Sequence, residues 1–455
     1  MNKNIYEQES LSKLIFVFGI PSILSLMIEL MTGVIDTAFA GNLPLSGGNA
    51  LSAMALISPL LGIFTALQTL FAMSTGILIS KYLNNKERQN RSYLTGVIMT
   101  VIVACATSLL CYLTLPHLLS ALGAKGEIYI LAKRYLQIQF LSNIFSSVGY
   151  TLTCCIRAFG FPKIEVIIIS CAVAVNIVFN FILAFIFNMG ISGLAWGTFI
   201  SEAVCAIGAI LFLIKKECYP HRIPMTASEF LHNAGELFKI GISQTVIQTI
   251  GGCTGFLVNS RLLSLGTMSH VAAWSVVQRI YTLLLVPIVG LTQGVQSIIS
   301  YLSGNQFHEK IEKVSKLTML YCSSYGVLAL VLITLFGQNF LSLFGGNAEI
   351  IEIARVVLFV VFIGFPFIGV LYTDVTLLQV TGHEIASVML IFSRQVLFLI
   401  PLIYLIPAFV PSLPELNIMG ISPVMSLFLC MPIADLLATG FAFILKKRLS
   451  HVTAG

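Results

Sequence analysis

The chain has 455 residues, of which 57% are hydrophobic and 10% are charged, and its mean hydropathy is +0.95. This composition excludes an ordinary soluble domain and is typical of a polytopic membrane protein. The formal net charge of +6 comes from basic residues in the loops between apolar stretches, so it indicates membrane topology and we expect no nucleic-acid partner.

About twelve apolar stretches are long enough to cross about 30 Å of hydrocarbon as helices. Continuous apolar runs exclude a transmembrane barrel, whose strands would be short and alternating. Helices then remain as the way to pair backbone groups in lipid. The predicted fold is an all-α polytopic membrane protein with twelve transmembrane helices in two pseudo-symmetric six-helix bundles. The predicted spans cover residues 13–40, 49–80, 93–115, 128–158, 163–187, 191–214, 237–262, 270–301, 316–337, 349–378, 386–408 and 420–445.

The two halves of the chain repeat each other. Most repeated residues stand 222 positions apart. The tripeptide Gly190-Ile191-Ser192 recurs as Gly420-Ile421-Ser422 with an offset of 230 positions instead, which indicates a short insertion within residues 407–417. Paired halves of an apolar chain are typical of transporters whose substrate path lies between two lobes. The repeated pairs that stand 222 positions apart are Gly19 and Gly241, Leu119 and Leu341, Gly123 and Gly345, Glu127 and Glu349, Ala132 and Ala354, and Gly160 and Gly382.

The longest polar stretch separates the halves. It predicts an N-terminal lobe over residues 1–214, a cytoplasmic linker over 215–239 and a C-terminal lobe over 240–455. Within the linker, four apolar residues fit a short amphipathic helix at the cytoplasmic surface, and a simple loop is the alternative. These residues are Phe230, Leu231, Leu237 and Phe238.

Lysine and arginine gather after the second, sixth, eighth and last predicted spans. Because cytoplasmic loops retain positive charge, we expect a multi-pass protein of the cell membrane with both termini in the cytoplasm. Glu7 and Glu9 precede the first apolar run, which lacks a small-residue cleavage site, so we expect that span to be retained.

Pro21 lies early in the first span, where a missing backbone donor and a ring clash bend a helix. Its counterpart in the second half is Ser243, so this bend is not repeated. We interpret Pro21 as the candidate hinge through which the first span responds to ion occupancy. A proline that packing merely tolerates is the alternative.

Carboxylates occur inside the first-half spans, where an ionised side chain costs about 2.5–3.5 kcal/mol. Glu29 and Asp36 lie two turns apart on one face of the first span. Asp36 is about four residues from the outer end, so an acid wetted at the interface is an equal alternative to an ion site. Glu202 lies deeper, about eleven residues into the sixth span and one turn after Thr198.

Asn176 and Asn180 show the same spacing of four on the preceding span and offer amide oxygens and donors from adjacent turns. With Asp36, Thr198 and Glu202 they predict an oxygen-rich site for a monovalent cation. Hydrogen bonds that merely hold helices together are the alternative. We favour the ion site because carboxylates cost more in lipid than amides do.

The second half is less acidic in its apolar regions. Arg394 and Asp435, on neighbouring spans, predict a structural ion pair. Asp374, near the cytoplasmic end of its span, is expected to snorkel or to cap a helix.

Enzyme chemistry finds no support in the sequence. The histidines lack metal-ligand spacing, the cysteines lack a Cys-x-x-Cys pair, and no phosphate-binding Gly-rich loop ends in Lys-Ser or Lys-Thr. We therefore expect no enzyme activity, no cofactor and no bound metal beyond the monovalent coupling cation. An ion gradient, of sodium or of protons, then has to supply the energy.

A series of motifs in chain order carries a resemblance to a known family, each weak alone and specific together. They are Pro21, Val34-Ile35-Asp36-Thr37-Ala38-Phe39-Ala40-Gly41, Arg157-Ala158-Phe159-Gly160-Phe161-Pro162, Gly190-Ile191-Ser192-Gly193-Leu194-Ala195-Trp196-Gly197-Thr198, Gln278-Arg279-Ile280-Tyr281 and Gln293-Gly294-Val295-Gln296-Ser297-Ile298-Ile299-Ser300-Tyr301. Over nearly its whole length the chain resembles the multidrug and toxic compound extrusion (MATE) transporters, especially their bacterial branch.

The resemblance implies export of bulky, often cationic, amphipathic small molecules in exchange for sodium ions or protons. It also implies a cleft that opens alternately to the two sides of the lipid bilayer. The family's ion-linked acid maps onto Asp36, and its polar positions map onto Asn176, Asn180 and Thr198. We further expect a monomer.

The chain departs from the family pattern at two positions. Many members carry Asp at the position of Asn180, and some relatives carry Glu at the position of Thr153. We infer that Glu202 replaces the missing carboxylate, and we keep Glu29 and Thr153 as further candidates for the cleft or for coupling. The alternative function is a flippase for a lipid-linked saccharide, which would need a strongly cationic cavity, whereas the deep first-half charges are mainly acidic.

Overall fold

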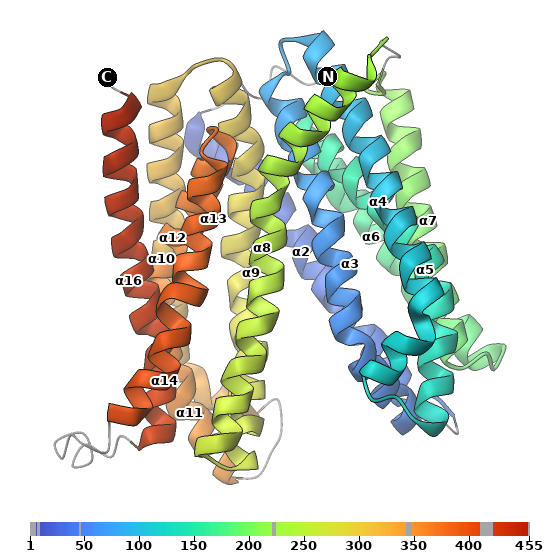
Figure 1. Ribbon diagram of the computed structural model, residues 1–455, viewed down its shortest axis with the longest axis vertical. Coiled ribbons are helices and arrows are strands. Elements are labelled where there is room, and N and C mark those ends of the chain that lie inside the picture. Colours follow the sequence, from blue (N-terminus) through green and yellow to red (C-terminus); the bar gives the residue numbers. More distant parts are fainter. Residues whose placement is uncertain are drawn as a thin grey trace. The chain divides into compact units, whose positions relative to one another are not determined.

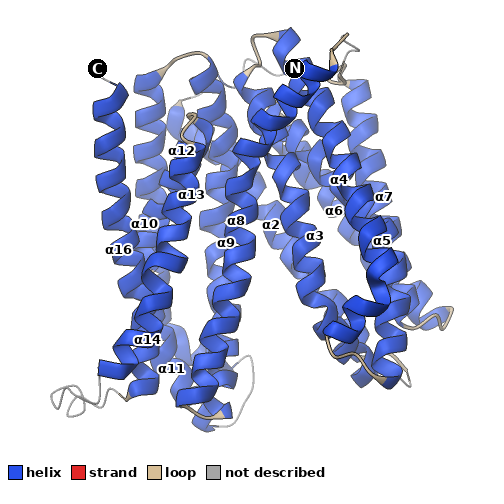
Figure 2. Cartoon of the chain, in the orientation of Figure 1, coloured by secondary structure: helices blue, strands red, loops and turns tan. Residues whose placement is uncertain are grey.

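A computed structural model of the protein describes Tyr6 and residues 10–44, 47–220, 224–342, 348–409 and 422–453. Over these residues the chain is helical and contains no β-strand (Figure 2). The helices can be followed in chain order by colour in Figure 1. Their bounds are α2 (Leu11–Gly41), α3 (Gly47–Lys81), α4 (Lys86–Ala121), α5 (Gly126–Ala158), α6 (Pro162–Phe181), η1 (Ile182–Ile186), α7 (Ile191–Lys215), α8 (Ala227–Leu265), α9 (Met268–Gly304), α10 (His308–Ser342), α11 (Ala348–Phe362), α12 (Phe365–Val380), α13 (Glu384–Phe392), η2 (Ser393–Leu399), α14 (Ile400–Phe409) and α16 (Pro423–Thr453).

These helices correspond one by one to the twelve predicted spans. Among the described residues, nine helices are long and apolar enough to cross a membrane, and α11 with α12 forms a tenth span that bends by 46°. The more polar helices α5 and α8, with 33 and 39 residues, complete the set and are long enough at about 1.5 Å per residue. The all-α, twelve-helix prediction is confirmed.

The tenth span is broken between Phe362 and Phe365, which hydropathy did not predict. Pro366 is the second residue of α12, where its missing N–H is harmless, whereas inside a continuous helix it would remove a hydrogen bond and its ring would clash with the preceding turn. The predicted insertion at residues 407–417 is described only as far as Phe409, and the rest lies outside the described residues.

Two spans contain a π-helical turn, the segments η1 after α6 and η2 between α13 and α14. A π turn places one extra residue in the helix and is frequent at functional sites. Both turns lie in the fifth helix of their half of the chain, and each adjoins polar residues described below.

The helices form two compact units, which we describe separately. Unit 1 consists of Met1–Thr245 and Gln293–His308, and unit 2 consists of Val246–Thr292 and Glu309–Gly455. The division therefore falls inside α8 and inside α9, whereas the sequence places the lobe boundary in the linker.

Glycines explain why parts of α8 and α9 belong to unit 1. A Cβ atom on Gly241 of α8 would lie 1.9 Å from the carbonyl oxygen of Leu70, and one on Gly294 of α9 would lie 2.6 Å from that of Phe18. Only glycine lets these backbones approach so closely, as is common where membrane helices pack. Gly241 is one of the repeated residues, so the repeat includes a packing position.

The second part of the predicted linker is helical, because α8 begins at Ala227 and continues without a break to Leu265. A separate surface helix is therefore not formed. The helix starts where the Thr226 hydroxyl accepts a hydrogen bond from the Glu229 N–H at 3.3 Å and the Glu229 carboxylate accepts one from the Thr226 N–H at 2.8 Å. This reciprocal arrangement is a capping box, which satisfies two backbone donors at a helix start.

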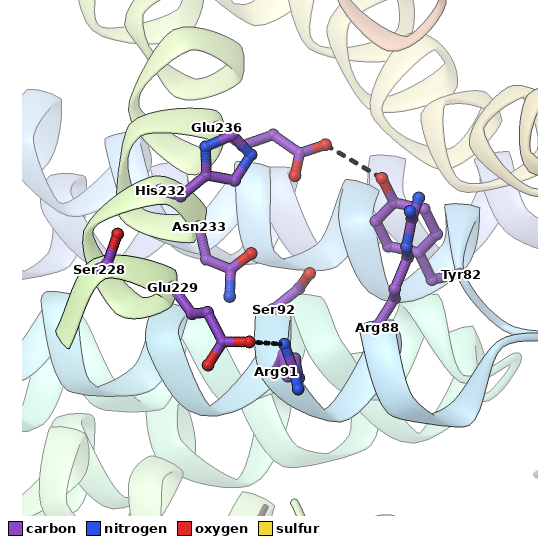
Figure 3. Close-up of a pocket in the computed structure, with 9 residues that line it drawn as sticks. All are labelled: Tyr82, Arg88, Arg91, Ser92, Ser228, Glu229, His232, Asn233 and Glu236. Atoms are coloured by element: carbon purple, nitrogen blue, oxygen red, sulfur yellow. Dashed lines mark hydrogen bonds and ion pairs between the residues drawn. The ribbon is translucent and has the colours of Figure 1, made fainter. Parts of the chain in front are cut away.

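A polar groove of about 540 Å³ lies between the first turns of α8 and the start of α4, next to Tyr82 in the turn that precedes α4 (Figure 3). Arg91 on α4 forms an ion pair with Glu229 at 2.6 Å, and the Tyr82 hydroxyl donates to Glu236 at 3.1 Å (Figure 3). The Arg88 guanidinium lies 5.7 Å from the centroid of the Tyr82 ring. These contacts tie the start of α8 to the first half of the chain.

Candidate functional site

Unit 1 brings together the three helices that carry the predicted ion-site residues. Helix α6 packs against α2 and α7, and α5 packs against α7 and α3. Asp36 on α2 therefore comes close to the asparagines of α6 and to the polar residues of α7.

Four of the five predicted residues form one hydrogen-bond network. The Asn180 side-chain nitrogen donates to Asp36 Oδ1 at 2.6 Å and to Asn176 Oδ1 at 3.0 Å. The Asn176 side-chain nitrogen in turn lies 3.5 Å from both Thr198 Oγ1 and Ser201 Oγ. The predicted spacing of four on α6 and on α7 thus places both polar pairs at one helix interface.

The network is buried toward α6 and more open toward α2. Asn176 and Asn180 are 1% and 0% exposed, whereas Asp36 is half-buried. Asn180 Oδ1 is buried and has no hydrogen-bond partner among the described residues. A carboxylate beside a spare amide oxygen offers the kind of oxygen ligands that hard cations prefer.

Two glycines on α7 make room for this arrangement. A Cβ atom on Gly197 would lie 2.0 Å from Asn180 Oδ1, and one on Gly193 would lie 2.6 Å from the backbone nitrogen of Ala184 in η1. The two glycines are four residues apart, the spacing that lets membrane helices approach closely. This spacing is a signal in the sequence that could have predicted the α6–α7 contact.

Glu202 lies one turn beyond Thr198 on α7 and is half-buried. It accepts a hydrogen bond from the Ser146 side chain on α5 and interacts electrostatically with Asp36. Ser146 also accepts from Gln68 of α3, at 3.0 Å through its carbonyl and 3.3 Å through its hydroxyl. Glu202 thereby connects the network to α5 and α3.

A second charged cluster lies in the same unit. Arg157 and Glu165 form an ion pair at 2.9 Å, with side chains that are 5% and 3% exposed. Arg157 also donates to the Ser22 hydroxyl at 3.4 Å, next to Pro21. Glu29 interacts electrostatically with Glu165, Glu202 and Arg157, so it is within electrostatic range of both clusters.

The Arg157–Glu165 pair was not predicted from the sequence. The two residues are eight positions apart, on either side of the turn before Pro162, where each looks like a charge at a helix end. Ser201 was not predicted either, nor was Tyr135, a buried residue of α5 that interacts with Thr198 and Asp36.

Thr153 and Pro21 occupy different settings. Thr153 is 1% exposed, its hydroxyl donates to the Tyr150 carbonyl of its own helix at 2.9 Å, and it lies one turn before Arg157. Pro21 is buried inside α2, which remains helical from end to end. The neighbouring Ser22 hydroxyl donates to the Phe18 carbonyl at 3.0 Å. A coupling role for Thr153 and a hinge at Pro21 both stay predictions.

Unit 2 holds its buried charges in pairs. Arg394 Nε donates to Asp435 Oδ1 at 2.6 Å, which confirms the predicted ion pair. Asp374 is fully buried and forms an ion pair with Lys446. The expectation that it snorkels to the membrane surface or caps a helix is therefore wrong. The reason is that Lys446, near the end of α16, reaches back to Asp374.

Comparisons with known proteins place the chain in one family. The family model MatE matches residues 21–182 and 245–405, one segment in each half of the repeat. The chain is 26% identical over 456 residues to the multidrug export protein MepA of Staphylococcus aureus strain MSSA476, an alignment that covers 99% of this chain and 97% of the relative. The MepA protein of Staphylococcus saprophyticus is also 26% identical, with 98% and 96% covered.

Solved structures show the same fold. An Asp-to-Asn mutant of the Vibrio cholerae MATE transporter VcmN matches with a TM-score of 0.89 and 18% identity over 99% of both chains. A MOP superfamily transporter from Pyrococcus furiosus matches with a TM-score of 0.87 and 17% identity over 100% of this chain and 99% of its own.

Proposed function

Because the chain belongs to the MatE family, we propose that it is a secondary active multidrug exporter, which moves amphipathic and often cationic small molecules in exchange for sodium ions or protons. Membership of this family makes it a transporter and not an enzyme. The multidrug export named for MepA supports the class of cargo.

The observation that carries the proposal is a contrast among the carboxylates inside the spans. Glu165, Asp374 and Asp435 each face a lysine or an arginine. Among the described residues, neither Asp36 nor Glu202 takes part in an ion pair, and their hydrogen-bond partners are an amide and a hydroxyl, respectively. A carboxylate at such depth is costly without a counter-charge. A cation from solution, Na⁺ or H⁺, would supply that charge.

In this scheme Asp36 is the primary coupling acid, and Asn176, Asn180 and Thr198 orient it and offer further oxygens. Glu202 takes the role of the carboxylate that many family members carry at the position of Asn180. Its electrostatic interaction with Asp36 supports this assignment.

Coupling requires that the ion and the cargo prefer different conformations, because a ligand shifts an equilibrium only through differential affinity. We propose alternating access, with the ion stabilising one facing and the cargo the other. Pro21 is the proposed hinge, and its neighbour Ser22 is contacted by Arg157, which interacts with Glu29. This chain of contacts would connect ion occupancy to Pro21 in α2.

The proposal includes a monomer in the cell membrane with both termini in the cytoplasm. A flippase for a lipid-linked saccharide is not favoured, because the uncompensated charges of unit 1 are acidic and would repel a pyrophosphate.

Ethidium efflux from cells that express the chain tests the function. We expect efflux that stops either when sodium is replaced by choline or when the proton gradient is collapsed, and that is absent from cells with an empty vector. Efflux that continues unchanged under both treatments would rule out ion-coupled antiport.

A further inference from the structure

Unit 2 contains a cavity of about 390 Å³ that the export scheme does not use. Residues of α8, α9, α11, α12, η2 and α16 line it. This volume is in the range that holds drug-sized ligands, which bind in mainly apolar cavities with a few polar groups. Its walls fit that description, since Ile247, Val258 and Leu285 lie beside Trp274 and Arg394.

The charged side chains of this cavity wall are Arg394 and Asp435, which balance each other in net charge, and the arginine is the more exposed of the two. The Arg394 side chain is 17% exposed and the Asp435 side chain only 4%, so the acid is more deeply buried than its partner. A Cβ atom on Gly364 would lie 2.7 Å from Asp435 Oδ2, and glycine there leaves room for the acid. Asp435 thus fixes Arg394 through Nε, and the N–H groups of the guanidinium that contact neither Asp435 nor the Tyr281 hydroxyl remain to meet a ligand.

The neighbouring aromatic groups add further donors. The Tyr281 hydroxyl accepts from Arg394 Nη2 at 3.3 Å, which leaves its own proton to donate. The Tyr281 ring is braced by Phe365, with centroids 5.4 Å apart. Trp274 is 3% exposed, and its indole N–H is buried without a hydrogen-bond partner among the described residues. The polar side of the cavity is therefore rich in donors, while Asp435 already receives a bond from Arg394.

The backbone at this point is specialised as well. Arg394 and Gln395 belong to the π turn η2, and Gln395 is tied to Thr254 of α8 at 2.9 Å. A π turn redirects side chains relative to a regular helix and is frequent at binding sites. The π turn between α13 and α14 thus places an arginine in the wall of the cavity. A regular apolar helix would be sufficient to span a membrane here.

We propose that this cavity is a second ligand site, which binds planar aromatic compounds that carry a carboxylate or another anionic group. The guanidinium fork matches a carboxylate in shape and charge. The rings of Trp274, Tyr281 and Tyr372 supply the aromatic contact surface. This site would prefer anionic ligands, whereas the acidic network of unit 1 would bind cations. It stands apart from the export proposal, because binding here requires no coupling ion.

A series of three naphthalene probes tests the charge preference, because the ring stays constant while the charge changes. The probes are 2-naphthoate, neutral 2-naphthamide and 2-naphthylmethylammonium, titrated into the purified full-length protein by calorimetry. We expect 2-naphthoate to bind about tenfold more tightly than 2-naphthamide, since hydrogen bonds to charged groups are the stronger ones, and the ammonium to bind most weakly. Equal affinities for the three probes would overturn the proposal.

Arg394→Lys keeps the charge and removes the fork, so the affinity for 2-naphthoate should fall about tenfold while that for 2-naphthamide changes little. The matched control is Arg279→Lys, at an exposed arginine of α9 outside the cavity wall, which should leave both affinities unchanged. Undiminished 2-naphthoate binding by a folded Arg394→Lys protein would contradict the proposal.

A local readout places the ligand in the cavity. The chain has two tryptophans, so Trp196→Phe leaves Trp274 as the sole indole. Its fluorescence should change on titration with 2-naphthoate in parallel with the calorimetric curve. Should Arg394→Lys not yield a monodisperse protein, Trp274→Phe replaces it as the test, because it removes one donor that has no partner to lose. We then expect weaker 2-naphthoate binding, and wild-type affinity would count against the site.

Discussion

Asn180 donates to Asp36 at 2.6 Å and to Asn176 at 3.0 Å through the same side-chain nitrogen. Both amide protons are thereby directed at acceptors, and the amide oxygen is left buried without a partner among the described residues. Asp36 is thus oriented by a neutral group that leaves its charge uncompensated. This relationship separates Asp36 from the carboxylates that pair with arginine or lysine, and it makes Asp36 the first residue to test.

Asp36→Asn should abolish ion-dependent ethidium export while the protein still folds. The variant keeps a side-chain oxygen that can accept from Asn180, so the helix contact survives and only the charge is lost. Efflux from membrane vesicles measures transport, and size-exclusion profiles measure folding. Glu309→Gln, at an exposed residue of α10, is the control that should transport normally. Wild-type efflux by Asp36→Asn would remove Asp36 as the coupling residue.

The number, order and approximate ends of the spans could be predicted because long apolar runs between basic loops leave one solution in a bilayer. The break before Pro366 could not, since a hydropathy average over a continuous apolar stretch does not register that a single proline disfavours an unbroken helix. The boundaries of the compact units could not be predicted from the sequence either, because they depend on close backbone contacts at Gly241 and Gly294.

Residues of the candidate site could be predicted where spacing along one helix decides the outcome. Asn176 and Asn180 share a face by their spacing, and the structure places them together. Partners on different helices were harder, because sequence does not give the rotation of one helix against another. Arg394 and Asp435 were found because both are conspicuous inside apolar runs, whereas Arg157 and Glu165 resemble ordinary charges at helix ends.

Glu202→Gln should change how export depends on sodium and on pH, with the maximal rate less affected than in Asp36→Asn. Glutamine retains an oxygen that can accept from Ser146, so the contact to α5 is kept while the charge that acts on Asp36 is removed. Efflux rates over a series of sodium concentrations and pH values measure the effect. The replacement role fails if the two dependences coincide with those of the wild type.

Arg157→Met should lower stability strongly, because it leaves Glu165 as an uncompensated charge that is 3% exposed. Breaking a buried ion pair costs about 3–5 kcal/mol, whereas replacing both partners by apolar residues is often close to neutral. The double variant Arg157→Met with Glu165→Met should therefore recover much of the loss. Apparent unfolding temperatures in detergent measure both. A single variant as stable as the wild type would show that the pair is not energetically coupled.

Acidification should loosen the first turn of α8. The Thr226 backbone N–H and the Arg91 guanidinium hold the pKa of Glu229 below its ordinary range. A carboxyl group whose pKa is lowered on folding stabilises the structure above that range, and this contribution is lost as the pH falls through the lowered pKa. Hydrogen exchange of the first turn of α8, corrected for intrinsic rates, should therefore accelerate only below the ordinary range of a glutamate.

Two variants separate this contact from general effects of acid. Glu229→Gln should exchange quickly at the start of α8 already at neutral pH. Glu312→Gln serves as the control, because the pKa of Glu312 is likewise lowered, by Lys316 on the same helix, yet that pair lies on α10. If acid leaves exchange at the α8 start unchanged in the wild type, the ion pair to Arg91 does not hold this turn.

Gly197→Ala tests whether the α6–α7 contact positions the coupling network. The added Cβ atom would meet Asn180 Oδ1 at 2.0 Å and its backbone nitrogen at 2.9 Å, so the Asn180 side chain, which donates to Asp36, has to move. Overpacking of this kind costs about 1–3 kcal/mol. We expect a lower unfolding temperature together with loss of ion-dependent efflux.

Gly208→Ala on the same helix is the matched control, since its Cβ atom would lie 3.7 Å from Ile168, an ordinary contact. An alanine that fits into a helix without a clash is expected to be neutral or to stabilise by roughly 0.5–1 kcal/mol. Equal behaviour of the two alanine variants would show that the approach of α7 to Asn180 does not control the network, because the same substitution at a crowded and at an open position would then have the same consequence.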